Sequence, residues 1–125
     1  MKELLVRLNG NYTLEKQFTT AYLKLLKEKW FYVDKISDWS VWSKKVDCYI
    51  RTSDETYCCE IKVINKNIFP VKKLRANQYT ALKKWHDLWW QAIVIVYSKT
   101  YKQYKIIPFS KILEIWKNDA IKLLF

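Results

Sequence analysis

The sequence of 125 residues has little glycine, proline, histidine or cysteine. It contains one glycine, two prolines and one histidine, His86. Without a stretch rich in glycine, proline or serine, the chain offers no obvious linker, and we predict a single domain over residues 1–125. Cys48, Cys58 and Cys59 form an odd set. They favour reduced, buried thiols over a disulfide framework, and with one histidine they do not favour a zinc site.

Long apolar runs are also missing. The longest strongly apolar run, 92–97, is far shorter than the ~20 residues that a membrane helix needs. The polar start, Met1-Lys2-Glu3, lacks the apolar region of a signal peptide. We therefore expect a cytoplasmic protein without a transmembrane segment.

Positive charge is what the sequence has in excess. Lys and Arg number 23 against 12 Asp and Glu, which gives a formal net charge of +11. Such a balance raises the local concentration of polyanions and favours nucleic acid or anionic lipid as a partner. The alternative is the solvated surface of a lysine-rich protein. Charge alone does not separate DNA from RNA or from a membrane.

The hydrophobic pattern predicts alternating helices and strands. Apolar residues recur at helical spacing after Thr13, which is placed to cap a helix, and Glu15 falls in its first turn. The expected order is α-β-β-β-α-β-β-α, which indicates a mixed sheet with helices packed on it. The expected elements are a helix at 13–29, strands at 30–36, 46–51 and 57–64, a helix at 74–88, strands at 91–97 and 104–109, and a helix at 110–116.

The hairpin formed by the second and third expected strands carries two acids and a lysine. With its turn centred between Ser53 and Asp54, Asp47 lies opposite Glu60, and Lys62 shares their face. Two opposed acids repel each other unless a hard cation binds between them.

We therefore expect Mg²⁺ or Mn²⁺ on Asp47, Glu60 and the carbonyl of Ile61, with Lys62 placing the attacking water or a phosphate. The alternative is a set of ordinary cross-strand ion pairs on an exposed face. The apolar flanks of both strands favour the first interpretation, because unpaired charge is costly in an interior strand.

Two helical residues fit the same site. Glu15 can turn toward the sheet to hold a second metal or a water, or it can be a surface acid favoured by the helix dipole. Gln78 lies in the apolar stripe of the helix at 74–88. A buried amide there needs partners, which a scissile phosphate, a metal-bound water or nearby backbone could supply.

In this order, the residues resemble the PD-(D/E)xK nuclease superfamily, and residues 13–97 resemble its compact branch of Holliday junction resolvases and virus-type repair nucleases. The resemblance implies a restriction-endonuclease-like α/β (α+β) fold with an αβββαβ core. It places the metal-binding acids on Asp47 and Glu60, the lysine on Lys62, the helix glutamate on Glu15 and the helix glutamine on Gln78. Val46 replaces the proline of the motif. By analogy, the resemblance also implies a homodimer.

The expected function is metal-dependent hydrolysis of DNA, with branched or otherwise structured DNA as substrate in DNA repair or recombination. Alternatives are a catalytically inactive basic DNA-binding module on the same fold and a membrane-surface protein. Lysines and an arginine near the site are expected to contact phosphates without reading sequence. They are Lys44, Lys45, Lys66, Lys72, Lys73, Arg75, Lys83 and Lys84.

Overall fold

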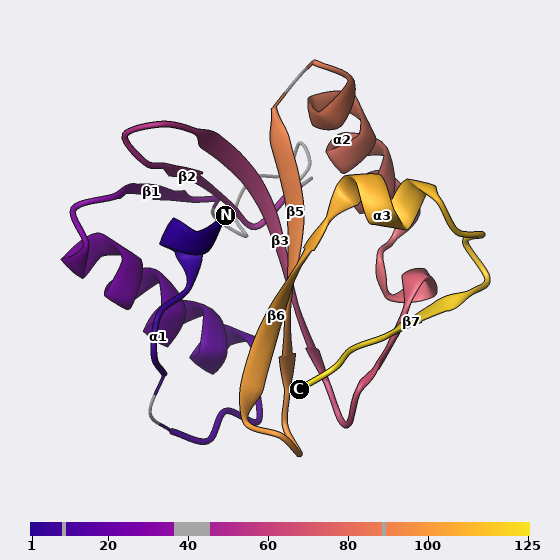
Figure 1. Cartoon of the computed structure of the whole chain (residues 1–125), viewed down its shortest axis with the longest axis horizontal. Coiled ribbons are helices and arrows are strands. Elements are labelled where there is room, and N and C mark those ends of the chain that lie inside the picture. Colours follow the sequence, from indigo (N-terminus) through magenta and orange to yellow (C-terminus); the bar gives the residue numbers. More distant parts are fainter. Residues whose placement is uncertain (9, 37–45, 89) are drawn as a thin grey trace.

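The computed structural model describes residues 1–8, 10–36, 46–88 and 90–125, and a five-stranded mixed sheet forms its centre (Figure 1). The strand order is β1-β2-β3-β5-β6, with β3 and β5 parallel and the other neighbours antiparallel. The strands are β1 (Tyr32–Lys35), β2 (Cys48–Arg51), β3 (Thr56–Ile64), β5 (Gln91–Ser98) and β6 (Gln103–Pro108).

Helices cover both faces of this sheet. In Figure 1, α1 (Glu15–Glu28) lies on one side, and α2 (Ala76–Asp87) and α3 (Phe109–Leu113) lie on the other. Side chains alternate between the faces along β3, as a pleated strand requires. Cys59 and Ile61 join the apolar cluster under α1, whereas Cys58 and Ile64 join the cluster under α2 and α3.

The predicted order of the main elements is confirmed, and the α/β fold class with it. Some details were wrong or missed. Thr13 does not cap α1; instead the side chain of Gln17 accepts hydrogen bonds from the N–H groups of Thr13 and Leu14. The last helix is shorter than predicted. The sequence pattern also did not reveal four short elements, η1 (Lys2–Leu4), β4 (Ile68–Pro70), η2 (Val71–Lys73) and β7 (Ala120–Lys122).

All three cysteines are buried and free, as expected. Within the described ranges, no helix has the length and apolar character needed to cross a membrane.

The register of the β2–β3 hairpin matches the prediction as far as Cys48. Cys48 pairs with Cys59 and Arg51 with Thr56. Both pairs are those expected for a turn centred between Ser53 and Asp54. The regular ladder ends there. The N–H of Asp47 donates to the carbonyl of Cys59, so Asp47 and Cys48 both face one residue of β3, as at a β-bulge. Asp47 is therefore not paired directly opposite Glu60, and this detail of the prediction was wrong.

Candidate functional site

The candidate site lies where β3 continues beyond the end of β2. β3 runs to Ile64, but its pairs with β2 reach only Cys59. On its other side, β3 stays paired with β5 along residues 57–64. Glu60 to Ile64 are therefore held by one neighbouring strand, while no strand in the described part of the chain pairs with their opposite edge.

Beyond the end of the β2–β3 ladder, the side chain of Asp47 bonds to β3. Its Oδ2 accepts a hydrogen bond from the N–H of Ile61 at 2.7 Å. Its own carbonyl accepts one from the N–H of Ile36, at the end of β1, at 2.9 Å. Asp47 is only 6% exposed. The bulge and these two bonds fix its carboxylate against β3, close to Glu60.

Glu60 is the most deeply buried acid of the site, at 1% exposure. Its Oε1 accepts a hydrogen bond from Nε2 of Gln78 at 2.9 Å, and Nζ of Lys62 lies 3.5 Å from the same oxygen. Gln78 is itself held, because its Oε1 accepts the N–H of Arg75 at 2.9 Å. Glu60 Oε2 is buried, and no donor within the described part of the chain bonds to it.

Three carboxylates converge at this point. Oxygens of Glu15, Asp47 and Glu60 all lie within 4.8 Å of one another. Glu15 is the first residue of α1 and the most accessible of the three. It reaches the other two acids although α1 covers the opposite face of the sheet from α2 (Figure 1). The open edge of β3 leaves room for this approach.

The electrostatics of the cluster are unfavourable without a counter-charge. Burial, followed by the neighbouring carboxylate of Asp47, raises the pKa of Glu60 from 4.5 to about 9, and Glu15 adds to the shift. Lys62 acts in the opposite direction but does not cancel it. At neutral pH Glu60 therefore retains a proton unless a cation takes its place.

The donor set fits a hard divalent cation. Carboxylate oxygens are the ligands that Mg²⁺ and Mn²⁺ prefer, and Glu60 Oε2 is a buried oxygen that still needs a partner. The backbone offers one more oxygen. A strand residue directs its N–H and C=O toward the same neighbour, and the N–H of Ile61 points to Asp47, so its carbonyl faces the open edge too.

The structure thus brings together the side chains that sequence reasoning selected for the site: Glu15, Asp47, Glu60, Lys62 and Gln78. The partners of the buried Gln78 amide are also clear: its Nε2 donates to Glu60, and its Oε1 accepts the N–H of Arg75 at the start of α2. The sequence analysis missed the bulge at Asp47. In the structure the bulge appears as three consecutive buried residues, Val46, Asp47 and Cys48, where a regular half-buried strand would alternate.

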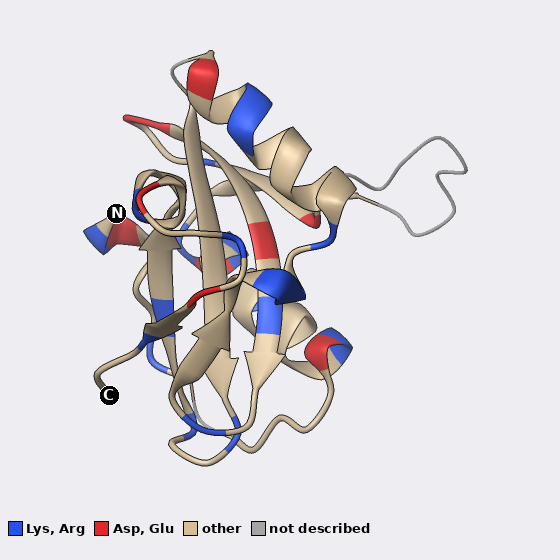
Figure 2. Ribbon diagram, turned by 90° about the vertical axis from the view of Figure 1, so that its right-hand side faces the viewer, with Lys and Arg blue, Asp and Glu red and all other residues tan. Residues whose placement is uncertain are grey.

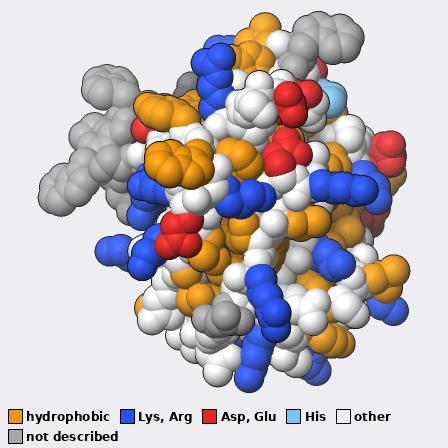
Figure 3. Space-filling view, turned by 60° about the vertical axis from the view of Figure 1, so that its left-hand side comes forward, with side chains coloured by type: hydrophobic (Ala, Val, Ile, Leu, Met, Phe, Trp, Pro, Cys, Tyr) orange, Lys and Arg blue, Asp and Glu red, His pale blue; other side chains and the backbone are white. Residues whose placement is uncertain are grey.

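The basic residues expected to contact DNA are exposed where the structure describes them. Lys66, Lys72, Lys73 and Arg75 are all exposed, and Nζ of Lys73 also reaches the carbonyl of Val63 at 3.4 Å. Figure 2 shows basic residues on helices, strands and loops, and on the face drawn in Figure 3 they are spread out rather than gathered in one block. Lys83 and Lys84 are exposed on α2, whereas Lys44 and Lys45 lie outside the described residues.

Comparison with known proteins gives one informative result. No protein-family model matches the sequence, and no curated protein sequence matches it either. Among solved structures, a Holliday junction resolvase, Hjc of the archaeal hyperthermophile Archaeoglobus fulgidus, superimposes with a TM-score of 0.66 at 16% identity. The match covers 86% of this chain and 87% of that one. The chain has the Hjc fold.

This finding confirms the expected restriction-endonuclease-like architecture, an αβββαβ core with a mixed sheet. Because the Hjc fold is shared at only 16% identity, the match concerns the path of the backbone and not the chemistry of the side chains. Function has to be argued from the site itself.

Proposed function

We propose that the chain is a divalent-metal-dependent endonuclease that cleaves branched DNA. The single observation that carries this proposal is the acid cluster: Glu15, Asp47 and Glu60 converge within 4.8 Å, and Glu60 keeps a buried oxygen without a donor. A scaffold without a catalytic role has no need for such a cluster, because buried like charges destabilise a fold. The Hjc fold and the charge of +11 support DNA as the substrate.

Each residue of the site has a role in this proposal. Asp47, Glu60, Glu15 and the carbonyl of Ile61 would hold Mg²⁺ or Mn²⁺. A bound cation of this kind lowers the pKa of water and offsets negative charge on a phosphate. Lys62, 12% exposed beside Glu60, would position the attacking water or stabilise charge on the phosphate. Gln78 holds Glu60 in place from α2.

The exposed cations serve a separate purpose. Lys66, Lys72, Lys73 and Arg75 would contact phosphates on either side of the cleaved bond and position the DNA without reading its sequence. A homodimer, which the family resemblance implies, would place two such sites on one junction and remains a prediction.

A substrate panel tests the proposal. Labelled junction, flap, nicked and linear DNA are incubated with Mg²⁺ and the parent protein, Asp47→Asn, Lys62→Ala or the control Asp54→Asn, which alters an exposed acid of the hairpin turn. We expect the parent and the control to cleave junction DNA, and the two site variants to lose activity by at least ~100-fold. Equal cleavage by site variants and parent would contradict the assignment.

The same panel separates the enzyme from an inactive DNA-binding module. Such a module would bind junction DNA in a salt-sensitive way, with no cleavage in Mg²⁺ or Mn²⁺ and no effect of either metal on binding. That result would overturn the enzymatic proposal and retain the DNA-binding one.

A further inference from the structure

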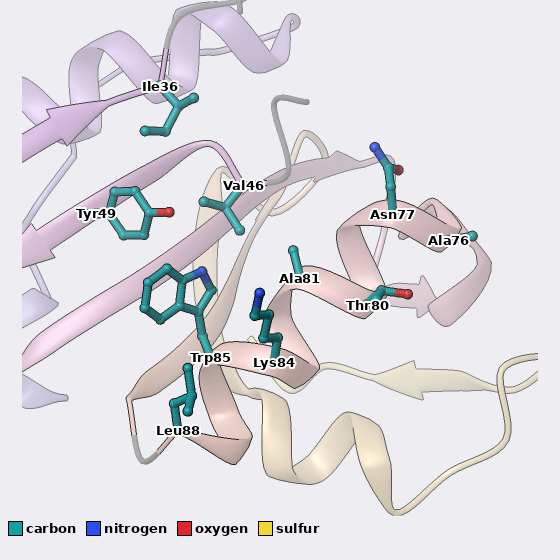
Figure 4. A pocket seen from close by; sticks show the side chains of 10 residues that line it. All are labelled: Ile36, Val46, Tyr49, Ala76, Asn77, Thr80, Ala81, Lys84, Trp85 and Leu88. Carbon is teal, nitrogen blue, oxygen red and sulfur yellow. The ribbon is translucent and has the colours of Figure 1, made fainter. Parts of the chain in front are cut away.

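A hollow of about 680 Å³ lies beside the acid cluster, between α2 and the ends of β1 and β2. Figure 4 shows it with Val46 and Tyr49 on the sheet side and Ala81 and Trp85 on the helix side. Its lining is mostly apolar. Val46 directly precedes Asp47, and Asn77 at the other end of the hollow directly precedes Gln78. The hollow therefore borders the two segments that carry Asp47 and Gln78 of the site.

Two aromatic rings form a fixed wall of this hollow. The rings of Tyr49 and Trp85 meet edge to face, with centroids 5.6 Å apart. Burial raises the pKa of Tyr49, and the neighbouring Trp85 side chain partly opposes this rise. Trp90 also packs against Trp85, with ring centroids 4.4 Å apart. The wall is thus preformed, and a flat ligand stacked on it would not have to order it.

The rim of the hollow is polar and positive. Lys84, Asn77 and Thr80 are exposed side chains that line it from α2. In Figure 4 the amine of Lys84 is directed toward Val46, across the opening. An apolar aromatic wall combined with a cationic rim is the pattern by which proteins hold unpaired bases, whose rings stack while their phosphates stay at the basic edge.

We infer that this hollow binds an unpaired nucleobase of the DNA next to the cleaved bond. The inference deepens the proposed function and rests on it for the identity of the polymer. Unpaired bases occur where a duplex is distorted, so such a pocket would favour distorted over regular DNA without reading sequence. A second hollow, of about 660 Å³, shares Tyr49 and Trp85 with the first and extends the aromatic surface to Tyr32 and Trp90. A neighbouring unpaired base would be able to stack on an aromatic ring there.

Binding in the presence of a chelator tests this inference independently of catalysis. The probe is a labelled duplex with one extra, unpaired adenine, compared with the same duplex carrying an abasic analogue at that position. We expect the parent to bind the adenine form roughly tenfold more tightly, a typical gain for stacking of one base. Reporting the ratio of the two dissociation constants removes any general loss of DNA affinity in a variant.

Variants of the hollow should change this ratio. Trp85→Leu removes the stacking ring and should bring the ratio close to one, whereas Trp85→Phe keeps a ring and should retain most of it. Ala81→Met fills the hollow with a flexible side chain and should abolish the preference even if Trp85→Leu fails to fold. Trp116→Leu, which removes an 82% exposed tryptophan that does not line the hollow, serves as the matched control.

The outcomes are distinct. A ratio near one for the parent, or a ratio that Ala81→Met leaves unchanged, would overturn the inference. A concentration-dependent dimer that Ala81→Met weakens, without any base preference, would assign the hollow to a second copy of the chain and would also overturn it. Metal-dependent cleavage without a base preference would leave the proposed function intact. A base preference without cleavage would overturn the proposed function and retain the hollow as a binding site for an unpaired base.

Discussion

The two faces of the sheet differ in how well the buried polar groups on them are hydrogen-bonded. Under α1, Phe18 stacks on Tyr22 and Tyr97, and the Tyr22 hydroxyl donates to the carbonyl of Leu4 at 2.8 Å. Under α2, Glu60 and Gln78 are buried, and Glu60 keeps an oxygen without a donor. Both faces belong to the same strands, so the difference arises from alternate residues of β3. Both faces contribute an apolar core, and the α2 face in addition bears the cost of burying Glu60, which a bound cation would offset.

The largest expected effect on stability comes from the α1 face. Leu26 is fully buried there, and Leu26→Ala leaves a cavity far from Glu15 along the helix. We expect the free energy of unfolding to fall by about 2–5 kcal/mol. Urea denaturation measures this effect. Leu124→Ala, the same substitution at a 77% exposed position, is the control and should change stability by less than about 0.5 kcal/mol.

A smaller effect should appear on the α2 face, and it depends on pH. The pKa of Glu60 is about 9 in the folded protein and near 4.5 when unfolded. Between these values the folded state holds a proton that the unfolded state has lost. The stability from this proton is therefore complete below pH 4.5 and is lost as the pH rises through 9.

Denaturation with a chelator present at pH 6 and pH 8.5 checks this sign. The parent should be less stable at pH 8.5, and Glu60→Gln should reduce that difference because an amide does not titrate. Glu114→Gln, at an exposed position, should behave like the parent. If stability depended on pH in the same way in Glu60→Gln and in the parent, burial of Glu60 would not be the cost that distinguishes the α2 face from the α1 face.

The smallest expected effect lies at the end of α1. Trp30 has φ 67° and is 95% exposed, and its N–H bonds to the carbonyl of Lys27 in the position where helices prefer glycine. Trp30→Gly should raise the free energy of unfolding by about 0.5–1 kcal/mol and leave cleavage unchanged. Trp116→Gly, at an exposed position where φ is not positive, should give no such gain. A gain at both positions would exclude backbone strain as the cause.

Much of the fold could be predicted because the hydrophobic pattern is strong. Period-two and apolar runs located β2, β3 and β5, and helical spacing located α1 and α2. The short strands β4 and β7 were missed because the residues that pair lie fifty or more positions apart in the sequence. Such distant pairing leaves no local signal in a three-residue segment.

The site was predicted to the level of its residues but not of its geometry. Register arithmetic placed Asp47, Glu60 and Lys62 together, since the hairpin turn sets the pairing of both strands. It could not show that the ladder bulges at Asp47, because the bulge rests on a backbone bond from Asp47 to Cys59 that leaves no mark in the apolar pattern. The aromatic hollow could not be predicted from the sequence either, since it forms between α2 and strands that are distant in sequence.

Calorimetric titration with Mn²⁺ at pH 7.5, in the absence of DNA, tests the central claim most directly. The parent should bind Mn²⁺ and release protons, because the cation replaces the proton on Glu60. Glu60→Gln should lose this binding, whereas Glu114→Gln should keep it. Absence of Mn²⁺ binding by the parent, or equal binding by Glu60→Gln, would contradict the claim that Glu15, Asp47 and Glu60 form a metal centre.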